Sequence, residues 1–581
     1  MKQSKNNAVF NLNNILISAF HEKKQFTDEL IVENNKIQKY ADKNLINDFN
    51  SIKNGKYFQI KKEKDITNET IIEKYAHSQY EKCFLDATFM YKKTGDIKYV
   101  SPIVLSLLKM KNSKYAINKF LPVIKKHADD NPDMLNLLAE VYFVQERYKK
   151  ALPIYEKLLE ICSGNQVLYT LYYKLSYIYE RVYQDKYIDK QIELCKKALD
   201  IIKDNSVATA FLAKLYYHQG NVDKAKKLYS TAYKNTESPD VKLGYSHFLM
   251  SIGELTKGYE VYKARFESNK VMYPQVLTQD KRWDGTSDLK DKTVIAHYEQ
   301  GFGDSVMFSR YIPDIAKLAK KVVFVVQKNL IPVFKSSGYE NFCELLSHEA
   351  DVNPNFSTKN GMGSVMFNTG NGMNRIPHDY HIPLADFPYL FKESPDKMLH
   401  SEGYLRADSK KVELFRKKYI NKNNKIKIGI AYHGTNKSIQ TYRDLQMKKF
   451  IPLFKMKNLE FYSLQVDEYS KEIDKLDKHF KVKNLKPYLK TFEDTACAMN
   501  CMDLIISTDN VVMNLAGALG IKTYGIFNVY PEGRWYKTEG NDVGWYKSVR
   551  PFKAKTFNDW NNVVKDIQKA IIEDFNLKKP D

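Results

Sequence analysis

A chain of 581 residues is too long for one hydrophobic core, so several domains are expected. An apolar fraction of 43% and an aromatic fraction of 13% are typical of a folded chain and exclude a wholly disordered one. The net charge of +22 comes from 91 basic and 69 acidic residues, but only eleven of the basic residues are Arg, which base readout favours. We therefore expect no dedicated nucleic-acid function, while attraction to acidic partners or substrates stays open.

The cysteines and the apolar segments narrow the class of protein further. The six Cys include no CxxC pair, and Cys497 and Cys501 lack a nearby His/Cys pair to complete a zinc site, so we expect buried apolar side chains and no metal. The apolar patch Ile15–Phe20 is neither a signal peptide nor a membrane span, and no later segment reaches the roughly 18 apolar residues that a span needs. We expect a cytoplasmic protein without a transmembrane segment.

A repeated spacing of small residues and aromatics runs through the first half of the chain. The best copy places residues at offsets of 0, 3, 7, 12, 16 and 19: Ala213, Tyr216, Gly220, Ala225, Tyr229 and Ala232. Further copies begin at Ala139 and Ser246, and looser ones begin at Ser176 and Thr88. Two helices per unit explain this spacing, because small residues let the helices approach closely and a Gly suits the turn between them.

This pattern resembles the tetratricopeptide (TPR) repeat, whose period of about 34 residues it nearly keeps. The resemblance implies a curved solenoid over residues 81–270 whose concave face holds a peptide or protein. An irregular helical domain with chance periodicity is the alternative. Residues 1–80 are polar but helical in pattern, and we expect an irregular helical N-terminal region there, built from degenerate hairpins or forming a separate cap.

Short β-rich runs alternate with helical stretches from about residue 290 onward. The first series has β-rich runs at Thr293–His297, Val322–Val326 and Ser364–Phe367, with helical stretches at Ser305–Ala319 and Leu330–Ser336. After the charged stretch Lys417–Lys425, a second series has β-rich runs at Ile426–Tyr432, Glu460–Leu464, Leu504–Ser507 and Thr523–Phe527. Such alternation predicts parallel sheets with helices on both faces, and the polar linker predicts two Rossmann-like lobes, residues 280–418 and 425–581. A ligand would bind at the carboxyl ends of the strands, in a cleft between the lobes.

The first strand-to-helix junction whose residues could take part in catalysis follows the strand Thr293–His297. Its sequence is Glu299-Gln300-Gly301-Phe302-Gly303-Asp304. Gly301 and Gly303 let a ligand approach the backbone, and Asp304 lies at the start of the next helix. A carboxylate in this position is either a helix cap or the general base that removes a proton from an acceptor hydroxyl.

Two further junctions belong to the second series. After Ile426–Tyr432, the residues Gly434, Thr435 and Asn436, with Arg443 nearby, form a small-residue turn suited to a phosphate. After Leu504–Ser507, the residues Asp509 and Asn510 precede the helix Val511–Leu519, whose N-terminus offers partial positive charge to a diphosphate. An ordinary capped helix is the alternative for the latter junction.

Several blocks appear in a fixed order: Trp283-Asp284-Gly285, Glu299–Asp304, Phe308–Tyr311, Tyr380–Leu384, Gly429–Gly434, Ser463–Gln465, Asp509 with Leu515–Gly520, Arg534-Trp535 and Trp545-Tyr546. Together they resemble the TPR-linked glycosyltransferases related to the heptosyltransferase family (family 9), and more distantly the TPR-containing protein O-GlcNAc transferases. Five of the scarce Arg fall inside or beside these blocks: Arg282, Arg310, Arg443, Arg534 and Arg550.

The resemblance implies an α-helical TPR-like solenoid followed by an α/β GT-B domain, with the acceptor on the first lobe and the nucleotide-sugar mainly on the second. It assigns Asp304 as the catalytic base. It assigns substrate contacts to Gly301, Gly303, Gly434, Thr435, Asn436, Arg443, Gln465, Asp509 and Asn510. The chain has no Asp-x-Asp motif, which is consistent with inverting, metal-independent transfer and no cofactor beyond the donor.

The chain also departs from the family's pattern. Asn510 and Asn514 stand where relatives commonly have Thr and His, and Tyr432 replaces a usual Trp. The two Asn residues mark either altered donor choice or lost activity. Trp535, Trp545 and Tyr546 could stack on a sugar or base, but packing is the expected role of aromatics near a lobe boundary.

The sequence thus predicts a glycosyltransferase that moves a sugar from a nucleotide-sugar to an acceptor hydroxyl. The expected acceptor is a protein held by the repeats, although a glycan or lipid-linked sugar stays open. The alternative is an interaction scaffold whose transferase domain is degenerate and inactive.

Overall fold

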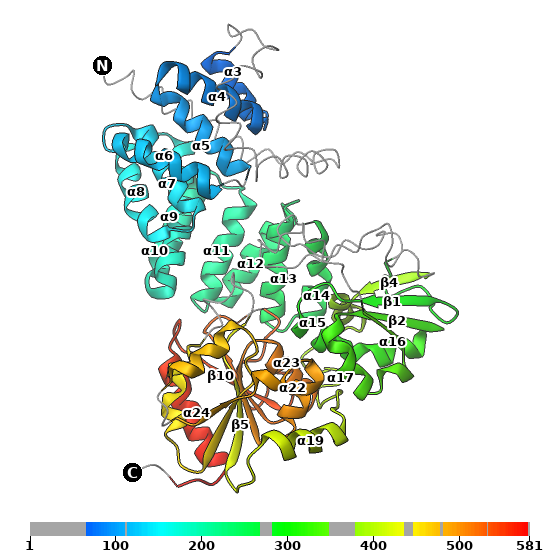
Figure 1. Ribbon diagram of the computed structural model, residues 1–581. Coiled ribbons are helices and arrows are strands. Elements are labelled where there is room, and N and C mark those ends of the chain that lie inside the picture. The colour runs from blue at the N-terminus through cyan, green and yellow to red at the C-terminus, as the bar shows by residue number, and fades with distance from the viewer. Residues whose placement is uncertain are drawn as a thin grey trace. The chain divides into compact units, whose positions relative to one another are not determined.

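The structure is a computed structural model that describes residues 66–110, 113–267, 282–347, 378–434, 445–476, 480–531 and 533–578. The chain forms two compact units, which divide between Leu228 and Tyr229. The first unit consists of helical hairpins, and the second unit joins the last hairpin to two parallel sheets (Figure 1). Within these ranges no helix is both long enough and apolar enough to cross a membrane.

Pairs of helices make up the repeats. They are α3 (Asn68–Ala76), α4 (Tyr80–Thr94), α5 (Val100–Lys109), α6 (Ser113–His127), α7 (Pro132–Val144), α8 (Tyr148–Ile161), α9 (Asn165–Tyr183), α10 (Ile188–Ile201), α11 (Ser206–His218), α12 (Val222–Lys234), α13 (Pro239–Ser251) and α14 (Leu255–Val261), followed by the 3₁₀ helix η6 (Tyr262–Glu267). Asn131 and Asn205 are the N-cap residues of α7 and α11. Their side chains accept hydrogen bonds from backbone N–H groups in the first turn of each helix. Most of the predicted region 1–80 lies outside the described residues.

The turn inside each hairpin confirms the TPR-like spacing. The residue at offset 7 has a positive φ in four copies: 68° at Gly95, 57° at Glu146, 87° at Gly220 and 85° at Gly253. Glycine adopts this left-handed conformation without steric cost, whereas Glu146 does not. The positive φ at offset 7 therefore explains why three of these four copies have glycine there.

Small residues at offsets 0 and 12 bring the two helices of a hairpin together, as the sequence predicts. Ser246 of α13 donates to the carbonyl oxygen of Gly258 in α14 at 2.9 Å. A Cβ on Gly258 would lie 2.5 Å from Cγ of Met250, so a larger residue would force the helices apart.

The second unit contains two wholly parallel sheets, which confirms the predicted fold class of helical repeats followed by two Rossmann-like lobes. The first sheet has the order β3-β2-β1-β4, with β1 (Thr293–His297), β2 (Lys321–Val326), β3 (Glu344–Ser347) and β4 (Tyr380–Pro383). The second has the order β10-β9-β8-β5-β6-β7, with β5 (Ile426–Ala431), β6 (Leu459–Ser463), β7 (Val482–Asn484), β8 (Leu504–Thr508), β9 (Thr523–Phe527) and β10 (Val549–Lys553). The predicted strand Ser364–Phe367 lies outside the described residues.

Helices cover both faces of the second sheet. Ile428 and Ile430 pack with Ile567 of α24 (Trp560–Asp574) in one core, whereas Ala431 and Ile505 share the other core with α22 (Phe492–Met499) and α23 (Val511–Ala518). Figure 1 shows α24 on one side of the sheet and α22 and α23 on the other. Burial on both faces explains the continuous apolar runs of these strands.

The predicted helix Ser305–Ala319 is interrupted. It consists of α15 (Phe302–Phe308), the 3₁₀ turn η8 (Ser309–Tyr311) and α16 (Ile312–Leu318). Pro313 has no N–H to donate to the carbonyl oxygen of Ser309, which accepts instead from the N–H of Ile312 and, at 3.1 Å, from the hydroxyl of Tyr339. The remaining helices are α17 (Ile331–Ser336), α18 (Phe387–Leu390), α19 (Ser409–Tyr419) and α21 (Ile451–Phe454).

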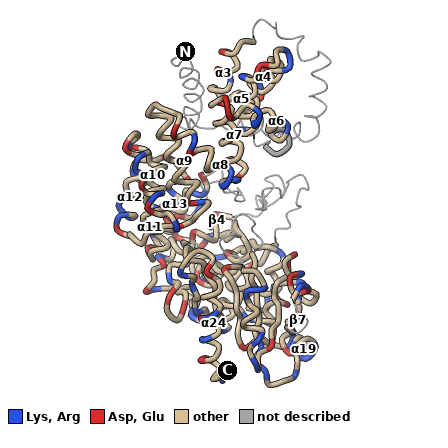
Figure 2. The backbone as a smooth tube through the Cα atoms, turned by 90° about the vertical axis from the view of Figure 1, so that its left-hand side faces the viewer, with Lys and Arg blue, Asp and Glu red and all other residues tan. Residues whose placement is uncertain are grey.

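Basic residues occur in both units, and five of them lie on α19. Figure 2 shows Lys and Arg interspersed with Asp and Glu along the described chain in both units.

Candidate functional site

The junction between β1 and α15 carries the predicted base. α15 begins at Phe302 with Gly301 as its N-cap, and Asp304 lies in the first turn of the helix. A carboxylate is favoured there by the helix dipole, and 18% of the Asp304 side chain is exposed. Asp304 is thus held by a buried strand and a helix while its carboxylate reaches solvent.

Arg534, from the segment after β9, forms an ion pair with Asp304. Its backbone is held on both sides. A Cβ on Gly533 would lie 2.3 Å from the carbonyl oxygen of His247 in α13, and Nε1 of Trp545 donates to the carbonyl oxygen of Arg534 at 2.7 Å. The fixed backbone keeps the Arg534 guanidinium near Asp304. An anionic ligand bound there would therefore compete with the Asp304 carboxylate for this cation.

In the second lobe, hydrogen bonds to one carbonyl oxygen connect the segments that follow β5, β6 and β8. The carbonyl oxygen of His433, just after β5, accepts from Nε2 of Gln465 at 3.2 Å and from Nδ2 of Asn510 at 3.3 Å. Oε1 of Gln465 also accepts from the N–H groups of Tyr432 and His433, at 3.0 and 3.1 Å. Gln465 is buried, so in this state it organises the backbone of the site and does not line an open surface.

Asn510 caps the N-terminus of α23. Its Oδ1 accepts from the N–H of Val512 at 2.8 Å and from that of Met513 at 3.4 Å. These are donors that a diphosphate at this helix end would use, so such a ligand would have to displace the Asn510 amide or bind beside it. The preceding residue, Asp509, is buried with 7% exposure.

Asn514 takes part in a buried network. Its Nδ2 donates to the carbonyl oxygen of Asn510 at 3.0 Å, and the hydroxyl of Tyr546 donates to its Oδ1 at 3.1 Å. The ring of Tyr546 also fills the space beside Gly517, where a Cβ would lie 2.4 Å away. The small residues of α23 therefore make room for an aromatic ring of the C-terminal segment.

The junctions of the two lobes meet at α15 and α23. A Cβ on Gly303 would lie 3.1 Å from Nδ2 of Asn514 and 3.7 Å from Cα of Val511. The rings of Phe302 and Phe492 also lie 4.9 Å apart. Asp304 of the first lobe and the Asn510–Asn514 turn of the second therefore face one region of the molecule.

Not every predicted site residue can be located. Gly434 follows β5 at the strand end, and no described atom lies within 4 Å of a Cβ built on it. Thr435, Asn436 and Arg443 lie outside the described residues. The ring of His433, just before them, stacks on Tyr469 with the ring centroids 3.9 Å apart.

A buried ionic cluster next to the Asp304 turn was missed by the sequence analysis. Arg265 of η6 donates from Nε and Nη2 to the two carboxylate oxygens of Glu299, both at 2.8 Å, and from Nη2 to Oδ1 of Asp386 at 2.8 Å. Nε of Arg282 donates to Oδ2 of Asp386 at 2.6 Å. Although burial alone would raise the pKa of Asp386, Arg265 and Arg282 hold it below its ordinary value. Because Arg is scarce in this chain, each Arg was a candidate for a functional or buried position. Arg265 was not singled out because it lies outside the ordered sequence blocks, which begin at Trp283.

Two buried His residues lie on neighbouring strands: His297 is the last residue of β1, and His381 is the second residue of β4. Nε2 of His297 lies 3.2 Å from Nδ1 of His381, and burial lowers the pKa of His297 to about 3. His297 is therefore neutral at physiological pH and is 2% exposed, so it is a packing residue of the lobe and not an accessible acid or base.

The aromatics near the lobe boundary are buried, as the sequence analysis expects of packing residues. Trp535 is 2% exposed, and Trp545 and Tyr546 are both 0% exposed. Arg310 is stacked among them, 5.3 Å from the Trp545 ring and 4.8 Å from the Tyr546 ring, and its Nη1 donates to the carbonyl oxygen of Trp545 at 2.9 Å. Arg310 therefore ties the first lobe to the C-terminal segment.

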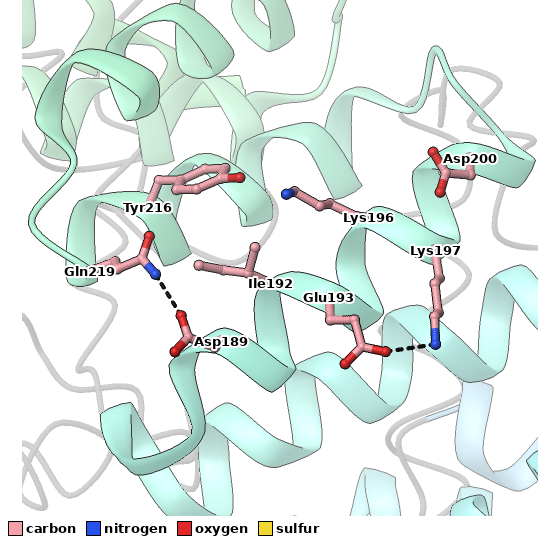
Figure 3. A pocket seen from close by; sticks show the side chains of 8 residues that line it. All are labelled: Asp189, Ile192, Glu193, Lys196, Lys197, Asp200, Tyr216 and Gln219. Atoms are coloured by element: carbon pink, nitrogen blue, oxygen red, sulfur yellow. Dashed lines mark hydrogen bonds and ion pairs between the residues drawn. The ribbon is translucent and has the colours of Figure 1, made fainter.

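The repeats of the first unit contain a separate cavity of about 550 Å³ between α10 and α11. Its lining residues are Asp189, Ile192, Glu193, Lys196, Lys197, Asp200, Tyr216 and Gln219 (Figure 3). Nε2 of Gln219 donates to Asp189 at 2.7 Å, and Lys197 pairs with Glu193 at 2.7 Å. Because these polar groups bind one another and both charge signs are present, the cavity does not define one ligand class.

The structure thus defines a class of protein: TPR-like helical repeats followed by two parallel α/β sheets. Among known proteins, the tetratricopeptide repeat family matches residues 192–242. Protein FlbA of Caulobacter vibrioides (strain ATCC 19089 / CIP 103742 / CB 15) is 23% identical over 364 residues, which are 61% of this chain and 59% of FlbA. The chain therefore spans less than two thirds of that relative's length.

Solved structures with similarity to the chain include two forms of MamA. MamA 41-end from Desulfovibrio magneticus RS-1 is 15% identical, with a TM-score of 0.26, and the match covers 31% of this chain and 99% of that one. MamA AMB-1 is 17% identical, with a TM-score of 0.24, and the match covers 29% of this chain and 95% of that one.

Proposed function

We propose that the chain is a glycosyltransferase that transfers a sugar from a nucleotide-sugar to an acceptor hydroxyl, with inversion and without a metal. The observation that carries the proposal is the approach of the two strand-to-helix junctions, where Gly303 lies against Asn514 beside Asp304. α/β lobes bind ligands at the carboxyl ends of their parallel strands, and both junctions follow such strand ends. In this proposal residues 280–418 and 425–581 are the two lobes of a GT-B domain.

In the proposed reaction, the Asp304 carboxylate accepts the proton of the acceptor hydroxyl. The acceptor oxygen then forms a bond to the anomeric carbon of the donor, and the bond from that carbon to the diphosphate breaks, which releases the nucleoside diphosphate. Side-chain and backbone donors would neutralise the leaving group. Arg534, which pairs with Asp304 in the ligand-free structure, is suited to that task once a diphosphate is present.

The donor would bind on the second lobe, along the turn Gly434–Asn436, Arg443 and the Asp509–Asn510 junction. The repeats would hold a protein acceptor, since TPR-like solenoids present extended binding surfaces. The resemblance of the sequence blocks to TPR-linked transferases supports this division of roles.

A thermal-shift panel of UDP, GDP, ADP, CMP and their common sugar conjugates tests the proposal. A ligand that binds only the native state, present at about a hundred times its dissociation constant, stabilises the protein by about 2.7 kcal/mol. We expect one nucleotide to raise the melting temperature of the second unit. A folded protein that responds to none of them would contradict donor binding.

One observation favours a second candidate, an interaction scaffold with an inactive transferase domain. The groups that the reaction would use are engaged inside the protein: Asn510, on the donor side, caps α23, and the base Asp304 pairs with Arg534. The scaffold predicts no nucleotide response and no change in any cellular glycosylation phenotype on Asp304→Asn. Loss of that phenotype in the variant would exclude it.

A further inference from the structure

The last helical hairpin holds the turn that leads to Asp304. The hydroxyl of Tyr262, the first residue of η6, accepts from Nε2 of Gln300 at 3.0 Å. Three residues after Tyr262, Arg265 donates two hydrogen bonds of 2.8 Å to Glu299, the residue before Gln300. Two consecutive residues of the junction are thus bound by two side chains from the end of the repeats.

This attachment is fixed because it is buried. The side chains of Arg265, Glu299 and Asp386 are 0%, 2% and 1% exposed. Buried charges of this kind are stable only when they are paired and hydrogen-bonded, so η6 cannot leave Glu299 without stranding a charge. The backbone N–H of Ala385 also donates to Glu299 at 3.1 Å, which completes the set of partners around this carboxylate.

The other side of the turn is bound by the neighbouring strand. Gln327, just after β2, donates from Nε2 to the carbonyl oxygen of Gln300 at 3.0 Å. Its Oε1 accepts from the hydroxyl of Ser305 at 2.7 Å. The segment Gln300–Ser305, which contains Asp304, therefore lies between one clamp from the sheet and one from the helical repeats.

We propose that Tyr262 and Arg265 are positioning residues for Asp304, so that the end of the helical repeats sets the geometry of the catalytic turn. This inference rests on the proposed function, in which Asp304 is the base. It assigns the repeats a part in the chemistry as well as in partner binding, because a base must lie within hydrogen-bond reach of the hydroxyl that it deprotonates.

Tyr262→Phe tests the inference with a minimal change, since it removes one hydroxyl and keeps the ring. Thr256→Val is the matched control. It removes a hydroxyl of α14 that donates to the carbonyl oxygen of Glu393 at 2.7 Å, and so attaches the same hairpin to the same lobe away from the turn. Hydrogen–deuterium exchange of the full chain should rise several-fold in peptides covering residues 300–308 for Tyr262→Phe. For Thr256→Val it should rise near Glu393 and stay at the wild-type level in residues 300–308.

The kinetic readout is release of nucleoside diphosphate from the nucleotide-sugar that stabilises the protein. For Tyr262→Phe we expect kcat to fall roughly three- to tenfold, the effect of one lost hydrogen bond, with the donor KM unchanged. Thr256→Val should keep wild-type kcat. Equal exchange and equal kcat in the two variants would overturn the inference alone. A wild-type protein that releases no nucleoside diphosphate would overturn the proposed function instead, and with it the catalytic meaning of the clamp.

Discussion

The hairpins α7–α8 and α13–α14 follow the same repeat pattern but have different surroundings. Both have a Tyr at offset 16, and both use small residues where the helices cross. In α7–α8 the hydroxyl of Tyr155 donates to Glu140 within the hairpin at 2.7 Å, whereas in α13–α14 the hydroxyl of Tyr262 accepts from Gln300 of the first lobe. The pattern thus determines how a hairpin closes, and the residues around it determine what the hairpin does.

The strongest test of this difference is Arg265→Met, which leaves the buried Glu299 without its cation and leaves Asp386 with Arg282 alone. We expect a loss of about 3–5 kcal/mol of unfolding free energy. All four Trp (Trp283, Trp535, Trp545 and Trp560) lie in the second unit, so denaturant unfolding followed by Trp fluorescence reports on it. Arg181→Met is the control in a repeat of the first unit. Arg181 is partly exposed and stacks on Tyr148 and Tyr177, so circular dichroism should show a loss of about 1 kcal/mol or less. Similar losses in both variants would contradict the distinction.

A pH series on Asp386→Asn sharpens the same point. The two Arg hold the pKa of Asp386 below its ordinary value, so its stabilising effect is fully present above the unfolded-state value of about 3.9. It is lost as the pH falls through the lower, folded-state pKa. We expect the variant to be less stable than the wild type by about 1.5–3 kcal/mol at pH 7, with the two stability curves converging only below about pH 4. Curves that stay parallel in acid would show that the carboxylate charge is not the cause.

The two hairpins differ in the size of the residue at offset 12, where their helices cross: Gly258 in α14 and Ala151 in α8. Gly258→Ala places a Cβ 2.5 Å from Cγ of Met250, so it should destabilise the second unit by about 1–3 kcal/mol although Ala is the better helix former. Ala151→Gly, at the same offset in α8, should cost the first unit about 1–2 kcal/mol, through helix propensity and the loss of a buried methyl group. A stabilising Gly258→Ala in Trp-monitored unfolding would mean that the hairpin has room to spare.

The hairpin turns provide the smallest expected effect. Glu146 adopts a φ of 57° where other copies have Gly, so Glu146→Gly should stabilise the first unit by about 0.5–1 kcal/mol. Gly220→Ala, where no described atom obstructs a Cβ, should destabilise that unit by a similar amount through the backbone alone. Circular dichroism melts of both variants measure the pair, and shifts in the same direction would refute the backbone explanation.

Local signals in the sequence predicted much of the fold. Thr293–His297 and Thr523–Phe527 are strands with the predicted bounds, because buried parallel strands are continuous apolar runs. The short strands Val482–Asn484 and Val549–Lys553 were not predicted because polar residues interrupt their apolar pattern, although each pairs with the strand that precedes it in the chain.

The candidate site could be predicted only in part. Asp304 and Asn510 were identifiable because each lies at a strand-to-helix junction. The partners that they bind, such as Arg534 for Asp304, lie far away in the sequence, so no local pattern links them. The clamp of Arg265 on Glu299 was missed for the same reason, because a buried ion pair depends on tertiary contacts.

The most direct test of the central claim is nucleoside diphosphate release by wild-type protein, Asp304→Asn and the control Asp314→Asn, which changes a carboxylate on α16 of the same lobe. The nucleotide-sugar that stabilises the protein is the donor, and water serves as acceptor. Removing a general base should lower the rate at least about a hundredfold in Asp304→Asn, with Asp314→Asn close to the wild type. Equal rates in the wild type and Asp304→Asn would contradict the account.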